Sequence, residues 1–425
     1  MTTPPKHDPY AALRLKDFRL FIYARLAMTI AFQMQEVILG WQIFALTKDP
    51  LSLGLIGLVA AIPALTVSLY AGHLSDVKNR RTITLITMAV MSLCTLAFYL
   101  ISLHLTAVYT SYGTFPIYSI LFIGGLASGF MSPAIMSFGT ELIEPELYAN
   151  ASAWRSSTWQ TGAIAGPAVG GLLYGFIGAE GSYITVLTLS VLSLIWMFLI
   201  PSRGVPKRGE EESIVDSLKA GIRFVFKNQI IVGALSLDLF AVLFGGAVAM
   251  LPVFASDILK IGPEGLGILR AAPSVGAVLV ALWMTRRPLS GEIGKQLFAV
   301  VIGFGLTIIV FGLSTNTYLS LAMLALGGAF DSVSVIIRSM LLQLSTPNKM
   351  RGRVEAVNMM FIGSSNEIGA FESGVAARVL KVVPSVVFGG CMTLVSVLVT
   401  ARLTPVLREL TYEELIAQSR NTHSS

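Results

Sequence analysis

The sequence predicts an all-α membrane protein of twelve transmembrane helices, arranged as two bundles of six. Three observations support this fold class. The chain is 54% hydrophobic and only 13% charged, whereas soluble domains are about 25% charged. Its apolar residues gather in long runs, and its basic residues gather in alternate loops between those runs. A soluble protein of this composition would expose apolar patches that promote aggregation.

Each apolar run is long enough for a spanning helix, which needs about 20 mostly apolar residues. Helices are expected rather than strands, because an open strand leaves backbone groups unpaired in lipid. Prolines inside several runs are tolerated where neighbouring helices cover the freed carbonyl groups. The predicted spans are 18–46, 52–74, 82–103, 117–140, 152–178, 182–201, 230–256, 265–286, 295–315, 317–343, 352–380 and 384–403.

The longest polar break, 202–229, divides the chain into an N-terminal bundle (18–201) and a C-terminal bundle (230–403). Twenty-one lysines and arginines fall in loops on one side of this topology, and four fall on the other. Basic residues are retained on the cytoplasmic side of membranes. The segment 1–17, the linker and the tail 404–425 are therefore predicted to be cytoplasmic.

The two halves resemble each other in sequence. The pair Gly124-Gly125 in the fourth span matches Gly327-Gly328 in the tenth, and Pro63 in the second span matches Pro273 in the eighth. Two six-span repeats of like orientation are typical of transporters that bind their substrate between the halves.

The first span carries a polar stripe. Its members fall at i, i+4, i+8, i+11 and i+15, which places them on one face of a helix. An unpaired charge at mid-bilayer costs about 3 kcal/mol or more, so this face is predicted to line a cavity or to pair with neighbouring helices. Glu36 is the preferred proton carrier, because intramembrane carboxylates mark proton pathways. The stripe consists of Arg25, Thr29, Gln33, Glu36 and Gly40.

Other spans also contain charged residues. In the tenth span Asp331 and Arg338 share a face, and either an internal ion pair or a transport role fits them. Asp238 in the seventh span is a second proton-site candidate. Glu367 and Glu372 in the eleventh span lie among small residues, and fit either a cavity or hydrogen-bond anchors at the outer side.

Several classes of function find no support in the sequence. No Gly-rich loop ends in Gly-Lys-Ser/Thr, which argues against ATP-driven transport. The four histidines are scattered and the two cysteines lie in opposite halves, so neither a metal centre nor another cofactor is predicted. No nucleophile and base come together as in an enzyme, and the basic residues form no continuous stripe for nucleic acid. An ion gradient is therefore the expected energy source.

The loop between the second and third spans resembles motif A of the major facilitator superfamily. It departs from the motif where Val77 replaces a basic residue and Asn79 replaces a glycine. The resemblance implies that Asp76 lies near Gly352 at the start of the eleventh span and helps to keep the cytoplasmic side closed. Retention of basic residues on the cytoplasmic side would by itself explain Arg80 and Arg81. The matching residues are Gly72, Asp76, Arg80 and Arg81.

The fifth span resembles motif C of the same superfamily, which is associated with antiporters. Glycine lets helices approach and slide, and proline bends a helix. Ordinary close packing is the alternative role. The matching residues are Gly162, Gly166, Pro167, Gly170 and Gly171.

The stretch 351–374 looks like the branch of the superfamily that contains the enterobactin exporter and related bacterial efflux proteins. The similarity extends from Phe18 to about Leu410. It implies the major facilitator fold, whose two bundles rock about a central cavity. The basic residue that motif B places in the fourth span is absent from 117–140, so Arg25 or Arg338 would take its role.

These observations predict a multi-pass protein of a bacterial inner membrane that acts as a monomer in the lipid bilayer. The predicted activity is proton-coupled efflux of a small organic molecule, such as a siderophore or a drug-like compound. Uptake by proton symport is one alternative. A membrane protein that acts as a sensor or accessory subunit and transports nothing is the other.

Overall fold

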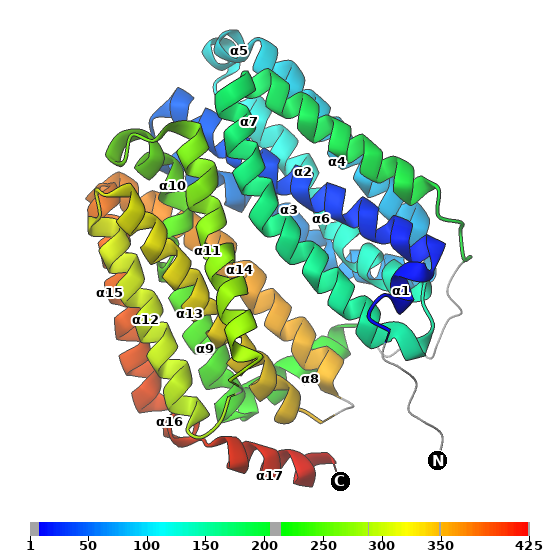
Figure 1. Ribbon diagram of the computed structural model, residues 1–425, viewed down its shortest axis with the longest axis vertical. Coiled ribbons are helices and arrows are strands. Elements are labelled where there is room, and N and C mark those ends of the chain that lie inside the picture. Colours follow the sequence, from blue (N-terminus) through cyan, green and yellow to red (C-terminus); the bar gives the residue numbers. More distant parts are fainter. Residues whose placement is uncertain (1–7, 205–213, 288, 348–349, 424–425) are drawn as a thin grey trace. The chain divides into compact units, whose positions relative to one another are not determined.

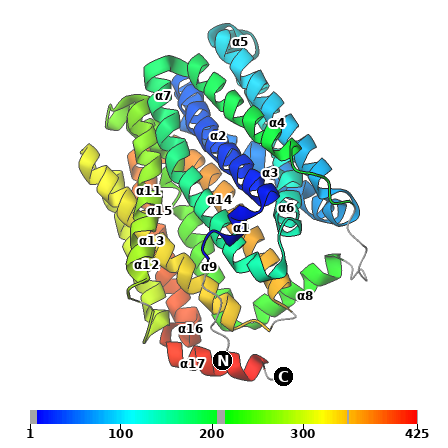
Figure 2. The same ribbon diagram turned by 45° about the vertical axis from the view of Figure 1, so that its right-hand side comes forward.

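The computed structural model describes residues 8–204, 214–287, 289–347 and 350–423, and within these ranges the chain is helical with short connections and no strand (Figures 1 and 2). Internal contacts divide the chain into two compact units. Unit 1 comprises Met1–Leu39 and Ile62–Gly209, and unit 2 comprises Gly40–Ala61 and Glu210–Ser425.

Unit 1 is built from the first part of the chain. Helix α2 begins in unit 1 and ends in unit 2, whereas α3 begins in unit 2 and ends in unit 1. The helices are α1 (Ala11–Arg14), α2 (Lys16–Thr47), α3 (Pro50–Val77), α4 (Arg80–Leu103), α5 (Leu105–Tyr112), α6 (Phe115–Glu141), η1 (Pro145–Leu147) and α7 (Tyr148–Phe198).

Unit 2 adds the remaining helices to the end of α2 and the start of α3. They are α8 (Ile214–Lys227), α9 (Gln229–Phe244), η2 (Ala247–Met250), α10 (Leu251–Val253), η3 (Phe254–Ile258), α11 (Gly262–Met284), α12 (Ile293–Leu313), α13 (Thr317–Leu344), α14 (Arg351–Leu380), α15 (Val382–Leu403), α16 (Pro405–Glu409) and α17 (Tyr412–His423).

Nine helices in the described ranges are long and apolar enough to cross a bilayer. One of them, α7, covers two predicted spans and bends at Gly178, whose φ of 69° favours glycine. The polar stripe makes α2 less apolar, and α14 likewise carries several charged and amide side chains, so neither is among the nine. These are Pro50–Ser68, Arg80–Leu103, Phe115–Glu141, Asn150–Phe198, Gln229–Ile258, Gly262–Met284, Ile293–Leu313, Thr317–Leu344 and Val382–Leu403.

Asparagine caps the start of three of these helices. The Oδ1 atom of Asn79 accepts a hydrogen bond from Thr82 N at the start of α4 (3.1 Å). Asn228 and Asn316 cap α9 and α13 in the same way. A side-chain oxygen at this position satisfies backbone donors that the helix itself leaves unpaired. The departure from motif A at Asn79 therefore gives α4 a defined start.

A glycine in each unit lies close to the backbone of a proline-containing helix, but in unit 1 this is Gly129, whereas a Cβ atom on Gly124 of the predicted repeat meets nothing within 4 Å. A Cβ atom on Gly129 of α6 would lie 2.6 Å from the carbonyl oxygen of Ala64, which follows Pro63 in α3. In unit 2 a Cβ atom on Gly328 of α13 would overlap the carbonyl oxygen of Pro273 in α11. In both units a glycine thus lets a helix approach the backbone of a proline-containing helix.

Replacing Gly328 with Val is expected to lower the melting temperature of the purified protein strongly. The new side chain would displace α11, and overpacking of this kind costs about 1–3 kcal/mol or more. Gly363→Val in α14 is the matched control, because a Cβ atom there meets nothing within 4 Å. Thermal unfolding in detergent compares the two variants, and equal melting temperatures would contradict the role given to Gly328.

Candidate functional site

In unit 1 two members of the polar stripe of α2, Thr29 and Gln33, pack directly against glycines of α7, and the two helices lie side by side in both views (Figures 1 and 2). A Cβ atom on Gly162 would lie 2.5 Å from Thr29 Cγ2. One on Gly166 would lie 2.5 Å from Gln33 Cβ. Because carbon atoms pack at about 3.5–4.0 Å, these two positions require glycine for the helices to approach so closely.

The contact continues along the rest of motif C. A Cβ atom on Gly170 would lie 2.9 Å from Met34 Cα. Pro167 and Gly171 are buried as well. Thr29 and Gln33 of the polar stripe, together with Met34, therefore meet three glycines of motif C in one helix contact. We call it the α2–α7 seam (Thr29, Gln33 and Met34 against Gly162, Gly166 and Gly170).

The two charged members of the stripe have different surroundings. Arg25 is partly buried, and its Nη1 atom lies 4.0 Å from the sulfur of Met136 in α6. Glu36, three turns further along α2, is exposed. Gln35, which the stripe does not include, accepts a hydrogen bond from Thr95 of α4 (2.7 Å), so α2 presents polar groups on a second face.

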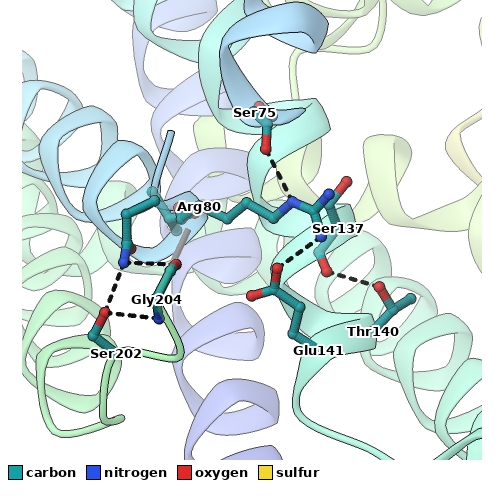
Figure 3. A network of polar contacts seen from close by, with 9 residues as sticks. Ser75, Arg80, Ser137, Thr140, Glu141, Ser202 and Gly204 are labelled. Carbon is teal, nitrogen blue, oxygen red and sulfur yellow. Dashed lines mark hydrogen bonds and ion pairs between the residues drawn. The ribbon is translucent and has the colours of Figure 1, made fainter. Parts of the chain in front are cut away.

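The motif A arginine Arg80 is held by groups from two other segments (Figure 3). Its Nη1 atom lies 2.7 Å from Glu141 Oε1 at the end of α6, and its Nε donates to the carbonyl oxygen of Ser75 in α3 (3.0 Å). Arg80 therefore ties the cytoplasmic ends expected for α3 and α6 together. Sequence reasoning missed Glu141, although an acidic residue at the end of a predicted span was a usable signal.

The neighbouring motif residues contact the end of α7 and the chain beyond it. Asn79 Nδ2 donates to Ser202 Oγ (2.6 Å) and to the carbonyl oxygen of Gly204 (3.0 Å) (Figure 3). Arg81 donates to the carbonyl oxygen of Phe198 (2.5 Å) and lies over its ring. A Cβ atom on Gly72 meets nothing within 4 Å, and the side chain of Asp76 lies outside the described residues.

In unit 2 a buried ion pair links α9 and α13. Asp238 and Arg338 form a direct carboxylate–guanidinium contact, and their side chains are only 7% and 8% exposed. The same two helices contribute to an apolar core cluster that includes Leu237, Ala241 and Ile337. Removing one partner of such a buried pair costs about 3–5 kcal/mol, because the other charge is left without compensation.

The structure thus gives Arg338 a partner other than the one considered from sequence. Asp331, seven residues before Arg338 in α13, makes no hydrogen bond or ion pair within the described part of the chain, and it is partly buried. Glu367 of α14 extends over Gly57 of α3, where a Cβ atom would overlap its carboxylate. Asp331 and Glu367 therefore lie apart from the buried ion pair.

Metal chemistry finds no support in the described ranges, because they contain no group of three His, Cys, Asp or Glu side chains that could hold an ion. The notable features are the hydrogen bonds of Arg80 and Arg81 in unit 1, the buried ion pair of Asp238 and Arg338 in unit 2, and the α2–α7 seam. Such an arrangement can bind a charged group or a proton and can let helices move.

Comparison of sequences places these features among transporters. A sequence model of the transmembrane secretion effector family, MFS_3, matches residues 7–424. Two enterobactin exporters (EntS), from Shigella boydii serotype 18 and Shigella flexneri, are each 24% identical over 392 residues, which is 92% of this chain and 92% of each relative.

Solved structures share the fold at lower identity. A POT family transporter in complex with 5-aminolevulinic acid aligns with a TM-score of 0.72 at 12% identity, covering 92% of this chain and 96% of that chain. The nucleoside transporter NupG aligns with a TM-score of 0.72 at 15% identity, covering 91% and 98%. At these identities the similarity establishes the fold alone. These relatives and structural neighbours are membrane transporters and not enzymes.

Proposed function

The chain belongs to the transmembrane secretion effector family of the major facilitator superfamily, and from that premise we propose that it exports a small organic molecule in exchange for protons. Family membership confirms the resemblance given by motifs A and C, and the chain is a multi-pass membrane protein. The proposal adds twelve spans with both termini in the cytoplasm, a bacterial inner membrane, and a monomer that works by alternating access.

The buried ion pair between Asp238 and Arg338 is the observation that best supports proton coupling. A carboxylate in this pair is stable while ionised, because the adjacent guanidinium compensates its charge. Protonation of Asp238 removes that compensation and leaves Arg338 as an isolated buried charge, which is costly. Binding and release of one proton would therefore favour two different arrangements of α9 and α13, as an alternating mechanism requires.

A siderophore-like substrate is proposed from the relatives, which are named as enterobactin exporters. The substrate class that this supports is a small organic molecule of this kind. In the proposed cycle motif A holds the cytoplasmic side closed through Asp76 and Arg80, and the glycines of motif C let α2 and α7 move against each other.

The direction of coupling is tested with purified protein in liposomes and labelled enterobactin as the probe. A lumen more acidic than the bath by about two pH units is expected to drive accumulation of the probe by exchange, and a protonophore is expected to abolish it. Accumulation only with the bath more acidic would instead establish proton symport. No flux under either gradient, with the protein correctly folded, would favour a sensor or accessory subunit.

A further inference from the structure

Two arginines of unit 1, Arg25 on α2 and Arg155 on α7, have no acidic partner among the residues that the structure describes. The polar contact of Arg25 is the long one to the Met136 sulfur. Neither guanidinium has a carboxylate within ion-pair distance among the described residues. Arg155 is also close enough to Arg25 to oppose its charge electrostatically.

The register of the α2–α7 seam explains why these arginines lie together. Gly162 faces Thr29 and Gly166 faces Gln33, so the two helices run in parallel along the seam. Arg25 lies one turn before Thr29. Arg155 lies seven residues before Gly162, which is two turns and therefore the same face of α7. Both arginines thus continue the seam towards its cytoplasmic end in the predicted topology.

Three other arginines of unit 1 have acidic partners, whereas the exposed Arg19 and the carbonyl-bound Arg81 do not. Arg14 pairs with Asp8, Arg80 with Glu141 and Arg203 with Asp17. The carboxylate of Glu36 is eleven residues from Arg25, or about 16 Å along the helix axis, which is too far for a contact. The charge of Arg25 and Arg155 therefore calls for an anion that the described residues do not supply.

Exposed apolar and aromatic side chains lie near this pair on the same helices and on α6. Trp159, one turn after Arg155, is 52% exposed, and Met136 beside Arg25 is 46% exposed. Phe32, two turns after Arg25 on the same face of α2, is 45% exposed. Exposed aromatic faces and a polarisable thioether bind aromatic rings well. Two guanidinium groups beside such a surface match a molecule that combines a ring with an acidic group.

We propose that Arg25 and Arg155 form a binding site for the anionic group of an aromatic organic acid, with Trp159, Met136 and Phe32 contacting its ring. As a substrate site it rests on the proposed export function, whereas binding itself does not. A lipid phosphate offers the same anionic chemistry. The packing of the arginine-bearing face of α2 against α7, and not outward, favours a free organic anion.

The test uses the full chain in phosphatidylcholine nanodiscs, with 1-naphthoate as the probe and its neutral isostere 1-naphthamide as the reference ligand, measured by calorimetry. Wild-type protein is expected to bind naphthoate at least about tenfold more tightly than naphthamide. Arg25→Gln and Arg155→Gln are each expected to abolish this preference, and Arg25→Lys to keep part of it. Arg19→Gln, an exposed arginine on the same helix, is the matched control.

Equal affinity of the wild-type protein for both probes would overturn the proposal, as would a preference that survives in both glutamine variants. Nanodiscs with added phosphatidylglycerol separate the two sources of anion. If that lipid displaces naphthoate and its own binding depends on the same arginines, the site holds lipid and the substrate assignment fails.

The liposome flux assay keeps this result distinct from the export proposal. Arginine-dependent naphthoate binding without any gradient-driven flux leaves the anion site standing and removes the export function. Flux of enterobactin that is unchanged in both glutamine variants leaves export standing and removes the site from transport.

Discussion

Replacing Asp238 with Asn is expected to reduce proton-driven transport at least about hundredfold. The amide keeps the shape of the carboxylate and an oxygen that accepts a hydrogen bond from Arg338, but it neither takes up nor releases a proton. Arg338 then has one unchanging neighbour, and the two arrangements of α9 and α13 no longer respond to the gradient. Flux under an imposed pH gradient is compared with exchange of labelled for unlabelled substrate at equal pH, which should persist.

Stability has to be separated from coupling, because the variant also leaves Arg338 without its counter-charge. The double variant Asp238→Asn with Arg338→Gln removes both charges, and replacing a buried pair completely is often neutral for stability. It is expected to regain the wild-type melting temperature without regaining gradient-driven flux. Asp257→Asn is the matched control, since Asp257 is exposed and bonds to Ser256. Recovery of flux in the double variant would make the pair purely structural.

Glu36 remains the other candidate for the proton carrier. Glu36→Gln in the same assay distinguishes the two, because the exposed position of Glu36 implies little effect on stability. Loss of gradient-driven flux in Glu36→Gln, together with normal flux in Asp238→Asn, would assign the proton to α2 in unit 1.

Helix positions were largely predictable because burial in lipid imposes long apolar runs that a single sequence displays directly. Helices α2 and α14 were predicted as spans, but their polar side chains make them too polar to be among the nine helices that are apolar enough to cross a bilayer. The bend at Gly178 was also predictable, because the two predicted spans on α7 are separated directly after this residue.

The interaction partners of the site residues were harder to predict than the helix faces on which these residues lie. Helical spacing placed Asp331 and Arg338 on one side of α13, yet Arg338 pairs with Asp238, 100 positions earlier in the chain. Periodicity within one helix carries no information about which other helix lies opposite. The same limit hid the seam, although Thr29 and Gln33 repeat with the same four-residue spacing as Gly162 and Gly166.

Replacing Gly166 with Val is expected to reduce transport at least about tenfold and to lower the melting temperature, because overpacking costs about 1–3 kcal/mol. Its Cβ atom would lie 2.5 Å from Gln33 Cβ, so α2 and α7 must separate at the centre of the seam. Gly124→Val in α6 is the matched control, since a Cβ atom there meets nothing within 4 Å. Flux is measured in liposomes and melting temperature in detergent, with protein from the same preparation.

The seam also permits a rescue that distinguishes a specific contact from general damage. A Cβ atom on Gly162 would lie 2.5 Å from Thr29 Cγ2 and 2.9 Å from Thr29 Cβ. Thr29→Ser removes the nearer carbon and keeps the hydroxyl that donates to the carbonyl oxygen of Arg25 (2.8 Å). Gly162→Ala should therefore be less harmful in the Thr29→Ser background, a coupling that appears only between residues in contact. Strictly additive effects on both stability and flux would show that the two helices do not meet at this point, and the motion proposed for motif C would lose its structural basis.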